Sequence, residues 1–157
     1  MGDATNQKLK LFISYSHEDE PLKNLLDKHL IMLKRSGKVD VWNDRKLIAG
    51  QEWDSGIKNE LQEADIILLL ISADFNNSEY IWKEELGEAM KRHEAGSARV
   101  VPVILRKCEW HEMPYAKLQA LPKGARPVAD FPDKDDAFTD IASGIRTLVD
   151  YMLQKKS

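Results

Sequence analysis

One run of six apolar residues constrains this chain more than any other feature. Ile66 to Ile71 reads IILLLI, with no polar residue in alternation. A short, uninterrupted apolar run rich in β-branched residues predicts a strand that is buried on both faces. Such a strand needs a layer of helices on each side, which is the arrangement of a parallel sheet. The run is far shorter than the roughly 18 residues needed to span a bilayer.

Strand and helix patterns alternate along the 157 residues, which is a length typical of one domain. We expect four further strands, at Leu9–Tyr15, Val39–Trp42, Arg99–Leu105 and Pro127–Ala129. Apolar residues at helical spacing predict helices at Leu22–Leu33, Trp53–Ala64, Ser78–His93 and Phe138–Met152. The order predicts a mostly parallel five-stranded sheet between two helical layers. Pro102 lies within a predicted strand and has no N–H, so we place it at a strand start or beside a sheet edge.

Composition excludes several classes of protein. The net charge of −3 gives no electrostatic footprint for nucleic acid, and no apolar run or signal peptide indicates a membrane or export. The single cysteine, Cys108, excludes an internal disulfide and favours a cytoplasmic location. We interpret Cys108 as a packed thiol rather than a nucleophile. The four histidines show no metal-ligand spacing, so no metal site is predicted.

Common catalytic motifs are also missing. Neither GxxxxGK[ST], GxGxxG nor GxSxG occurs. A phosphorelay receiver domain shares the alternation of strands and helices, but it requires an acidic pair after the first strand and an Asp after the third. Here the first strand ends in Ser14-Tyr15-Ser16, and Asp74 comes one residue late after the third. The receiver interpretation is therefore disfavoured.

Sites in parallel α/β sheets form at the carboxyl ends of the strands. That rule selects four segments before any family is considered. They are Tyr15–Asp19, Asn43–Gly50, Ser72–Trp82 and Arg106–Trp110.

The same segments carry a resemblance to the Toll/interleukin-1 receptor (TIR) domain. Leu11 to Ser16 (LFISYS) with Asp19 resembles its first box, and Val41 to Trp53 resembles its second strand, BB loop and next helix. Ile66 to Ser72 with Ser78-Glu79-Tyr80 resembles the central strand and the entry to the following helix. The runs Val101–Arg106, Cys108–Trp110 and Leu118–Pro122 are similar to bacterial members.

This resemblance implies a flavodoxin-like α/β sandwich over residues 10–154, preceded by a flexible segment at residues 1–9. It implies one of two functions. The first is an NAD+ hydrolase that releases nicotinamide and linear or cyclised ADP-ribose when the domain self-associates. The second is a non-catalytic adaptor that acts through TIR–TIR contacts. NAD+ would be a substrate, so no cofactor is expected. The implied partners are other TIR domains and a fused or separate sensor module of a defence system.

The enzymatic members depend on a glutamate in the helix after the central strand, and two adjacent glutamates compete for that role. At about 100° per residue, Trp82, Leu86, Ala89, Met90 and His93 form a core stripe. Glu84 then faces solvent, whereas Glu85 lies at the edge of the stripe and is favoured. One feature of the resemblance opposes this choice. Many members carry an aromatic residue four positions before the glutamate, and Tyr80 has that spacing from Glu84 rather than Glu85.

The resemblance also implies a set of residues around the substrate. They are Ser14, Tyr15, Ser16, Asp44, Arg45, Ser72, Trp82 and Trp110. Loop residues 45–48 (Arg45, Lys46, Leu47 and Ile48) are implied in self-association. Simpler interpretations stay open: Ser16 as a helix cap, Asp44 and Arg45 as solvated loop residues, Trp82 as a core anchor and Trp110 as a surface cover. Trp42 and Trp53 are expected to be packing residues.

Overall fold

A computed structural model describes residues 8–42 and 53–156, without the side chains of residues 53–55 and 156. The described strands are β1 (Leu9–Ser14), β2 (Val39–Trp42), β3 (Ile66–Ile71) and β4 (Arg99–Ile104). They form one parallel sheet in the order β2-β1-β3-β4. Every side chain of β3 is 0% exposed. The strand is therefore buried on both faces, as the IILLLI run predicts.

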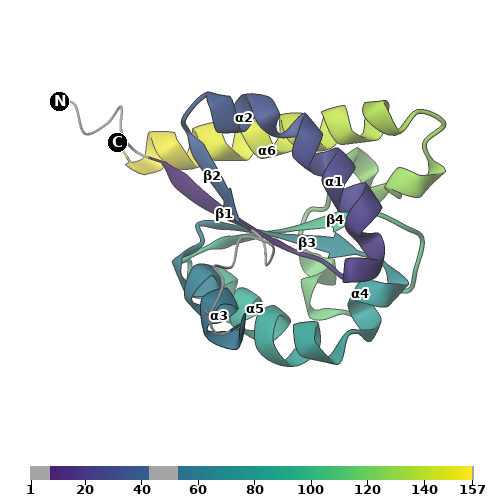
Figure 1. Ribbon diagram of the computed structural model, residues 1–157, viewed down its shortest axis with the longest axis horizontal. Coiled ribbons are helices and arrows are strands. Elements are labelled where there is room, and N and C mark those ends of the chain that lie inside the picture. The colour runs from purple at the N-terminus through teal and green to yellow at the C-terminus, as the bar shows by residue number, and fades with distance from the viewer. Residues whose placement is uncertain (1–7, 43–52, 157) are drawn as a thin grey trace.

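The helices cover both faces of this sheet (Figure 1). They are α1 (Glu20–His29), α2 (Ile31–Arg35), α3 (Trp53–Glu63), α4 (Ala73–Asn77), α5 (Gly87–Glu94) and α6 (Lys134–Lys156). Helices α1, α2 and α6 pack on one face through a cluster centred on Leu26, Leu33, Phe138 and Ile145. Helices α3, α4 and α5 pack on the other through Ile57, Phe75, Leu86 and Ala89. The expected three-layer architecture is confirmed.

Short helical segments complete the chain. They are η2 (His17–Asp19), the π-helix η4 (Ile81–Leu86), η5 (Pro114–Lys117), η6 (Lys123–Ala125) and η7 (Val128–Asp130). The predicted first helix is divided at Leu30 into α1 and α2.

The expected fifth strand at Pro127–Ala129 is wrong among the described residues. That segment enters the 3₁₀ turn η7, and an isolated parallel bridge joins Val103 to Leu121 instead. The N–H of Leu121 donates to the carbonyl of Pro102 at 2.9 Å, and the N–H of Ile104 donates to Leu121 at 2.8 Å. Pro122 follows at once, and a residue without an N–H cannot extend a ladder. Pro102 therefore turns its missing donor toward the outer edge of β4, where the chain tolerates it.

Candidate functional site

A buried polar pair joins the end of β1 to the π-helix η4. Ser14, the last residue of β1, is 1% exposed, and Glu85 of η4 is 7% exposed. The Ser14 hydroxyl donates a hydrogen bond to Oε1 of Glu85 at 2.5 Å. Side chains alternate along a strand, so Ser14 shares with Phe12 the sheet face that η4 and α5 cover. The fold therefore fixes one carboxylate in a nearly dry position beside the carboxyl end of β1.

The neighbouring carboxylate lies in a different environment. Glu84 is an outer residue of η4, with 33% of its side chain exposed, and its Oε2 lies 3.2 Å from Nζ of Lys58 on α3. An exposed ion pair of this kind contributes little to stability, typically about 0–1 kcal/mol. The two adjacent glutamates are thus separated by burial, with Glu85 inward and Glu84 outward.

The expected role of Trp82 as the core anchor of this helix is wrong. Its side chain is 43% exposed, and the indole N–H donates to the carbonyl of Asn76 at 2.6 Å. Ile81 takes the buried position instead, one π-turn before Leu86. A π-helix bonds residues five apart, so a stripe drawn at about 100° per residue selects the wrong first member.

The same geometry accounts for the aromatic residue that opposed the choice of Glu85. Tyr80 is the N-cap residue of η4 and precedes Glu85 by five positions. In a π-helix, residues five apart are joined across one turn, as residues four apart are in an α-helix. Tyr80 therefore lies one turn before Glu85 in this π-helix. In an α-helix, with a spacing of four, it would lie one turn before Glu84.

A second polar cluster joins the ends of three strands, and of its members Asp19, Ser72 and Arg106 sequence reasoning assigned only Ser72. The Ser72 hydroxyl donates a hydrogen bond to Oδ2 of Asp19, and Nε of Arg106 lies 3.1 Å from Oδ1 of Asp19. Ser72 also caps α4 by accepting from the N–H of Phe75 at 3.0 Å. Burial raises the pKa of Asp19, although the hydrogen bond from Ser72 and the charge of Arg106 oppose that shift. Asp19 and Arg106 each lie in a segment that the strand-end rule selects, which is the signal that pointed to them.

The three consecutive residues at the end of β1 point to different places. Ser14 faces Glu85, whereas Tyr15 packs into the cluster on the opposite face of the sheet. The Tyr15 ring lies 5.4 Å below Nζ of the buried Lys23. Ser16 accepts from the N–H of Glu18 at 3.3 Å and caps η2, as the simpler interpretation proposed. The structure does not bring these three side chains together around Glu85.

The remaining predicted residues are placed as follows. Trp110 is half-buried, packs against the cluster beneath η4 and α5, and lies 4.4 Å from the ring of His111. Trp42 stacks on Phe12 at 5.3 Å, as a packing residue would. The predicted residues 44–48, and the side chain of residue 53, lie outside what the structure describes. Burial is the main cause that raises the pKa of Cys108, so its thiol is a poor nucleophile at neutral pH.

This arrangement supplies two fixed carboxylates, Glu85 held by Ser14 and Asp19 held by Ser72 and Arg106. No group of three potential metal ligands occurs within residues 8–42 and 53–156. A carboxylate with fixed orientation is suited to stabilising positive charge that develops on a substrate.

Comparison with known proteins identifies the family. The TIR-domain family profile matches residues 11–143, which is most of the chain. This chain belongs to the TIR family. The described part of the TIR domain has no helix long and apolar enough to cross a membrane.

One curated relative is a bacterial protein. The TIR domain is 46% identical over 136 residues to the uncharacterized protein y4lF of Sinorhizobium fredii (strain NBRC 101917 / NGR234). The match covers 87% of this chain and 42% of that protein, so the chain spans less than half the length of its relative. Among solved structures, the TIR domain of the Toll-related receptor TRR-2 from Hydra magnipapillata is 20% identical. That match covers 63% of this chain and 72% of the receptor domain, with a TM-score of 0.43.

Proposed function

We propose that this TIR domain hydrolyses NAD+, with Glu85 as the catalytic carboxylate. The observation that carries the proposal is the Ser14–Glu85 pair, which fixes a buried carboxylate at the carboxyl ends of the strands. Ligands of open parallel sheets bind at those ends. Glu84, which is paired with Lys58 on the outside of the helix, is the weaker candidate.

The reaction needs only one carboxylate from the protein. Ordinary glycosidases use two, because the leaving group must be protonated. In NAD+ the nicotinamide is already cationic. The bond from ribose C1′ to the ring nitrogen breaks with both electrons going to nitrogen, so nicotinamide leaves neutral. Glu85 holds the ribose hydroxyls and stabilises the oxocarbenium charge. Water then adds at C1′ and loses a proton, or a base of the substrate attacks instead and gives a cyclised product.

The remaining predicted contacts belong to the same proposal. Ser72, Trp82 and Trp110 lie at or after the strand ends, and the exposed indole of Trp82 is available to stack on a substrate ring. Residues 44–48 of a neighbouring copy are proposed to complete the site, so activity requires self-association. We further propose a cytoplasmic effector role under the control of a sensor module.

The test is nicotinamide release from NAD+ by concentrated or artificially clustered protein. We expect turnover that the variant Glu85→Gln abolishes and the variant Glu84→Gln retains, because only Glu85 is held inside the fold. Both substitutions preserve side-chain shape, and far-UV circular dichroism verifies that each variant is folded. Absence of turnover in every assembled form would refute the hydrolase proposal. Turnover that survives Glu85→Gln but not Glu84→Gln would show that Glu84, rather than Glu85, is the catalytic carboxylate.

A second candidate is a non-catalytic TIR module that signals through TIR–TIR contacts. The hydrogen bond from Ser14 favours it, because a buried carboxylate held by a buried hydroxyl also serves as a structural pair. This candidate predicts assembly without nicotinamide release. It also predicts that Glu85→Gln changes stability and leaves assembly intact.

A further inference from the structure

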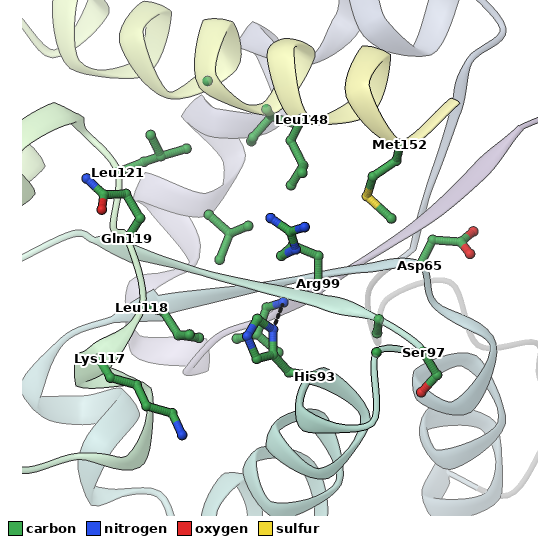
Figure 2. A pocket seen from close by; sticks show the side chains of 16 residues that line it. Asp65, His93, Ser97, Arg99, Lys117, Leu118, Gln119, Leu121, Leu148 and Met152 are labelled. Atoms are coloured by element: carbon green, nitrogen blue, oxygen red, sulfur yellow. Dashed lines mark hydrogen bonds between the residues drawn. The ribbon is translucent and has the colours of Figure 1, made fainter. Parts of the chain in front are cut away.

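A cavity of about 820 Å³ lies along the outer edge of β4, away from the proposed catalytic carboxylate. Arg99, the first residue of β4, lines it, whereas Glu85 is bonded to the last residue of β1. In a parallel sheet these are opposite ends. The volume lies within the range of about 300–1,000 Å³ that is typical of small-molecule sites. Figure 2 shows the cavity between β4, α6 and the segment 117–121.

A guanidinium group projects into this cavity. The side chain of Arg99 rises from β4 toward Leu148 and Met152 of α6 (Figure 2). Within the described part of the chain, no hydrogen bond or ion pair engages that guanidinium. Guanidinium presents its N–H groups as a planar fork that binds a carboxylate or phosphate through two parallel hydrogen bonds.

His93 adds a neutral donor at the wall of the cavity. Its Nδ1 accepts a hydrogen bond from the N–H of Val100 at 3.1 Å, on the outer edge of β4. Burial lowers the pKa of His93, and the charges of Arg99 and Lys117 lower it further, so the ring is neutral at pH 7. With Nδ1 accepting, the proton is on Nε2, which leaves an N–H that can donate to a ligand.

The other charged groups of the cavity are already engaged. Nζ of Lys117 lies 3.0 Å from a carboxylate oxygen of Glu94. The carboxylate of Asp65 accepts from the backbone N–H of Lys10 at 2.8 Å. Arg99 is an exposed residue, so its guanidinium is the charged group of the cavity that is available to bind an anion from solvent.

The opposite wall is apolar. It is formed by Leu121, Leu148 and Met152, which line the cavity and are only partly buried. Gly144 lets α6 approach closely, because a Cβ there would come within 2.7 Å of the Leu121 side chain. Unbranched methionine adapts to ligands of varied shape.

We propose that this cavity is a binding site for a small organic anion with an apolar body. The carboxylate, sulfonate or phosphate of the ligand binds the guanidinium of Arg99 and the Nε2–H of His93. The apolar body lies against Leu148 and Met152. The site is independent of the chemistry proposed for Glu85.

The probe is 8-anilinonaphthalene-1-sulfonate, an aromatic sulfonate whose fluorescence rises in apolar surroundings. We expect one saturable site in the folded protein. The variant Arg99→Met should weaken binding at least about tenfold, the order expected for one charge-assisted hydrogen bond. Leu148→Trp fills the apolar wall and should abolish binding. The matched control is Arg146→Met, an exposed α6 residue outside the cavity, which should leave the affinity unchanged.

A neutral probe separates the contribution of the anionic group to binding from that of the apolar body. N-phenyl-1-naphthylamine has the same aromatic framework without the sulfonate, so it should bind more weakly and be insensitive to Arg99→Met. Equal affinity of the sulfonate for wild type and Arg99→Met would overturn the proposal. If Leu148→Trp fails to fold, amide chemical shifts of the wild-type protein decide. Shifts at Gly96, Ser97 and Leu148 support the site, and shifts confined to other regions contradict it.

Discussion

The Ser14–Glu85 hydrogen bond gives a quantitative prediction about stability. The variant Ser14→Ala removes one donor from a carboxylate that is 7% exposed. A hydrogen bond to a charged group contributes about 1.5–3 kcal/mol. Glu85 takes part in a further interaction in the folded state, so we expect the lower end, about 1.5 kcal/mol. For a domain of this size, that corresponds to a fall in Tm of roughly 3–6 °C.

A double-mutant cycle isolates the pair from other effects of the substitution. Glu85→Leu removes the carboxylate and leaves the Ser14 hydroxyl buried without its acceptor. In that background Ser14→Ala should be neutral or stabilising, because the hydroxyl no longer has a bond to lose. The coupling energy between the two positions should therefore be at least about 1.5 kcal/mol.

Urea unfolding followed by far-UV circular dichroism at pH 7 measures each free energy of unfolding. The control is Ser143→Ala on the exposed side of α6, which should change stability by less than about 0.5 kcal/mol. A coupling energy below about 0.5 kcal/mol would refute the argument that Ser14 holds the carboxylate. A large effect of Ser143→Ala would show that serine truncation alone, rather than the bond, is being measured.

Three further predictions concern other polar groups, of which Asp19 and Tyr115 are buried. Burial raises the pKa of Asp19 above 3.8, so the folded state binds the Asp19 proton more tightly than the unfolded state does. Protonated Asp19 therefore contributes stability at low pH, and that contribution is lost as pH rises through the folded pKa. Asp19→Asn should remove that loss, which unfolding measured from pH 4 upward will detect. Arg92→Met deletes three hydrogen bonds to backbone carbonyls and should lower the free energy of unfolding by about 3 kcal/mol, read by urea denaturation. Tyr115→Phe removes a buried hydroxyl bonded to a side-chain amide at 2.7 Å and should lower Tm by roughly 2–6 °C, measured by calorimetry.

Matched controls exist for the last two. Lys91→Met lies beside Arg92 on the exposed side of α5, and Tyr151→Phe removes a hydroxyl from an exposed ring. Neither should shift stability by more than about 0.5 kcal/mol. Losses in the controls equal to those of Arg92→Met and Tyr115→Phe would contradict both predictions. A stability difference between wild type and Asp19→Asn that is the same at every pH would contradict the first.

The layered architecture could be predicted from local patterns because a strand that is buried on both faces has an apolar run without alternating polar residues. Ile66–Ile71 is such a run, and every side chain of that strand is inaccessible in the structure. The expected strand at Pro127–Ala129 failed for the opposite reason. Whether a segment pairs with an edge strand depends on which of its backbone N–H groups face that strand. Proline limits such pairing because it has no N–H, and a hydrophobicity pattern does not report this.

The site was predictable to the level of strand ends, but not to the level of individual contacts. The strand-end rule selected the segments that contain Asp19, Ser72 and Arg106, whereas Ser14 and Glu85 lie outside those segments and were proposed from the family resemblance and from helical phase. It did not show that Tyr15 turns to the opposite face or that Asp19 and Arg106 meet, because such contacts join residues distant in the sequence. The anchor Trp82 was misplaced because helical phase was assumed to be that of an α-helix.

The π-helix η4 has a consequence for how this chain is aligned with other TIR domains. A π-turn contains one residue more per turn than an α-turn, so relative to an α-helical equivalent it corresponds to a single inserted residue. Against a TIR domain whose corresponding helix is α-helical throughout, an ungapped alignment across Ile81–Leu86 places the residues on one side of the insertion out of register by one. Adjacent glutamates make that error easy to miss, since either choice still aligns an acid with an acid. A one-residue gap within η4 is the alignment that keeps both Tyr80 and Glu85 in structurally equivalent places.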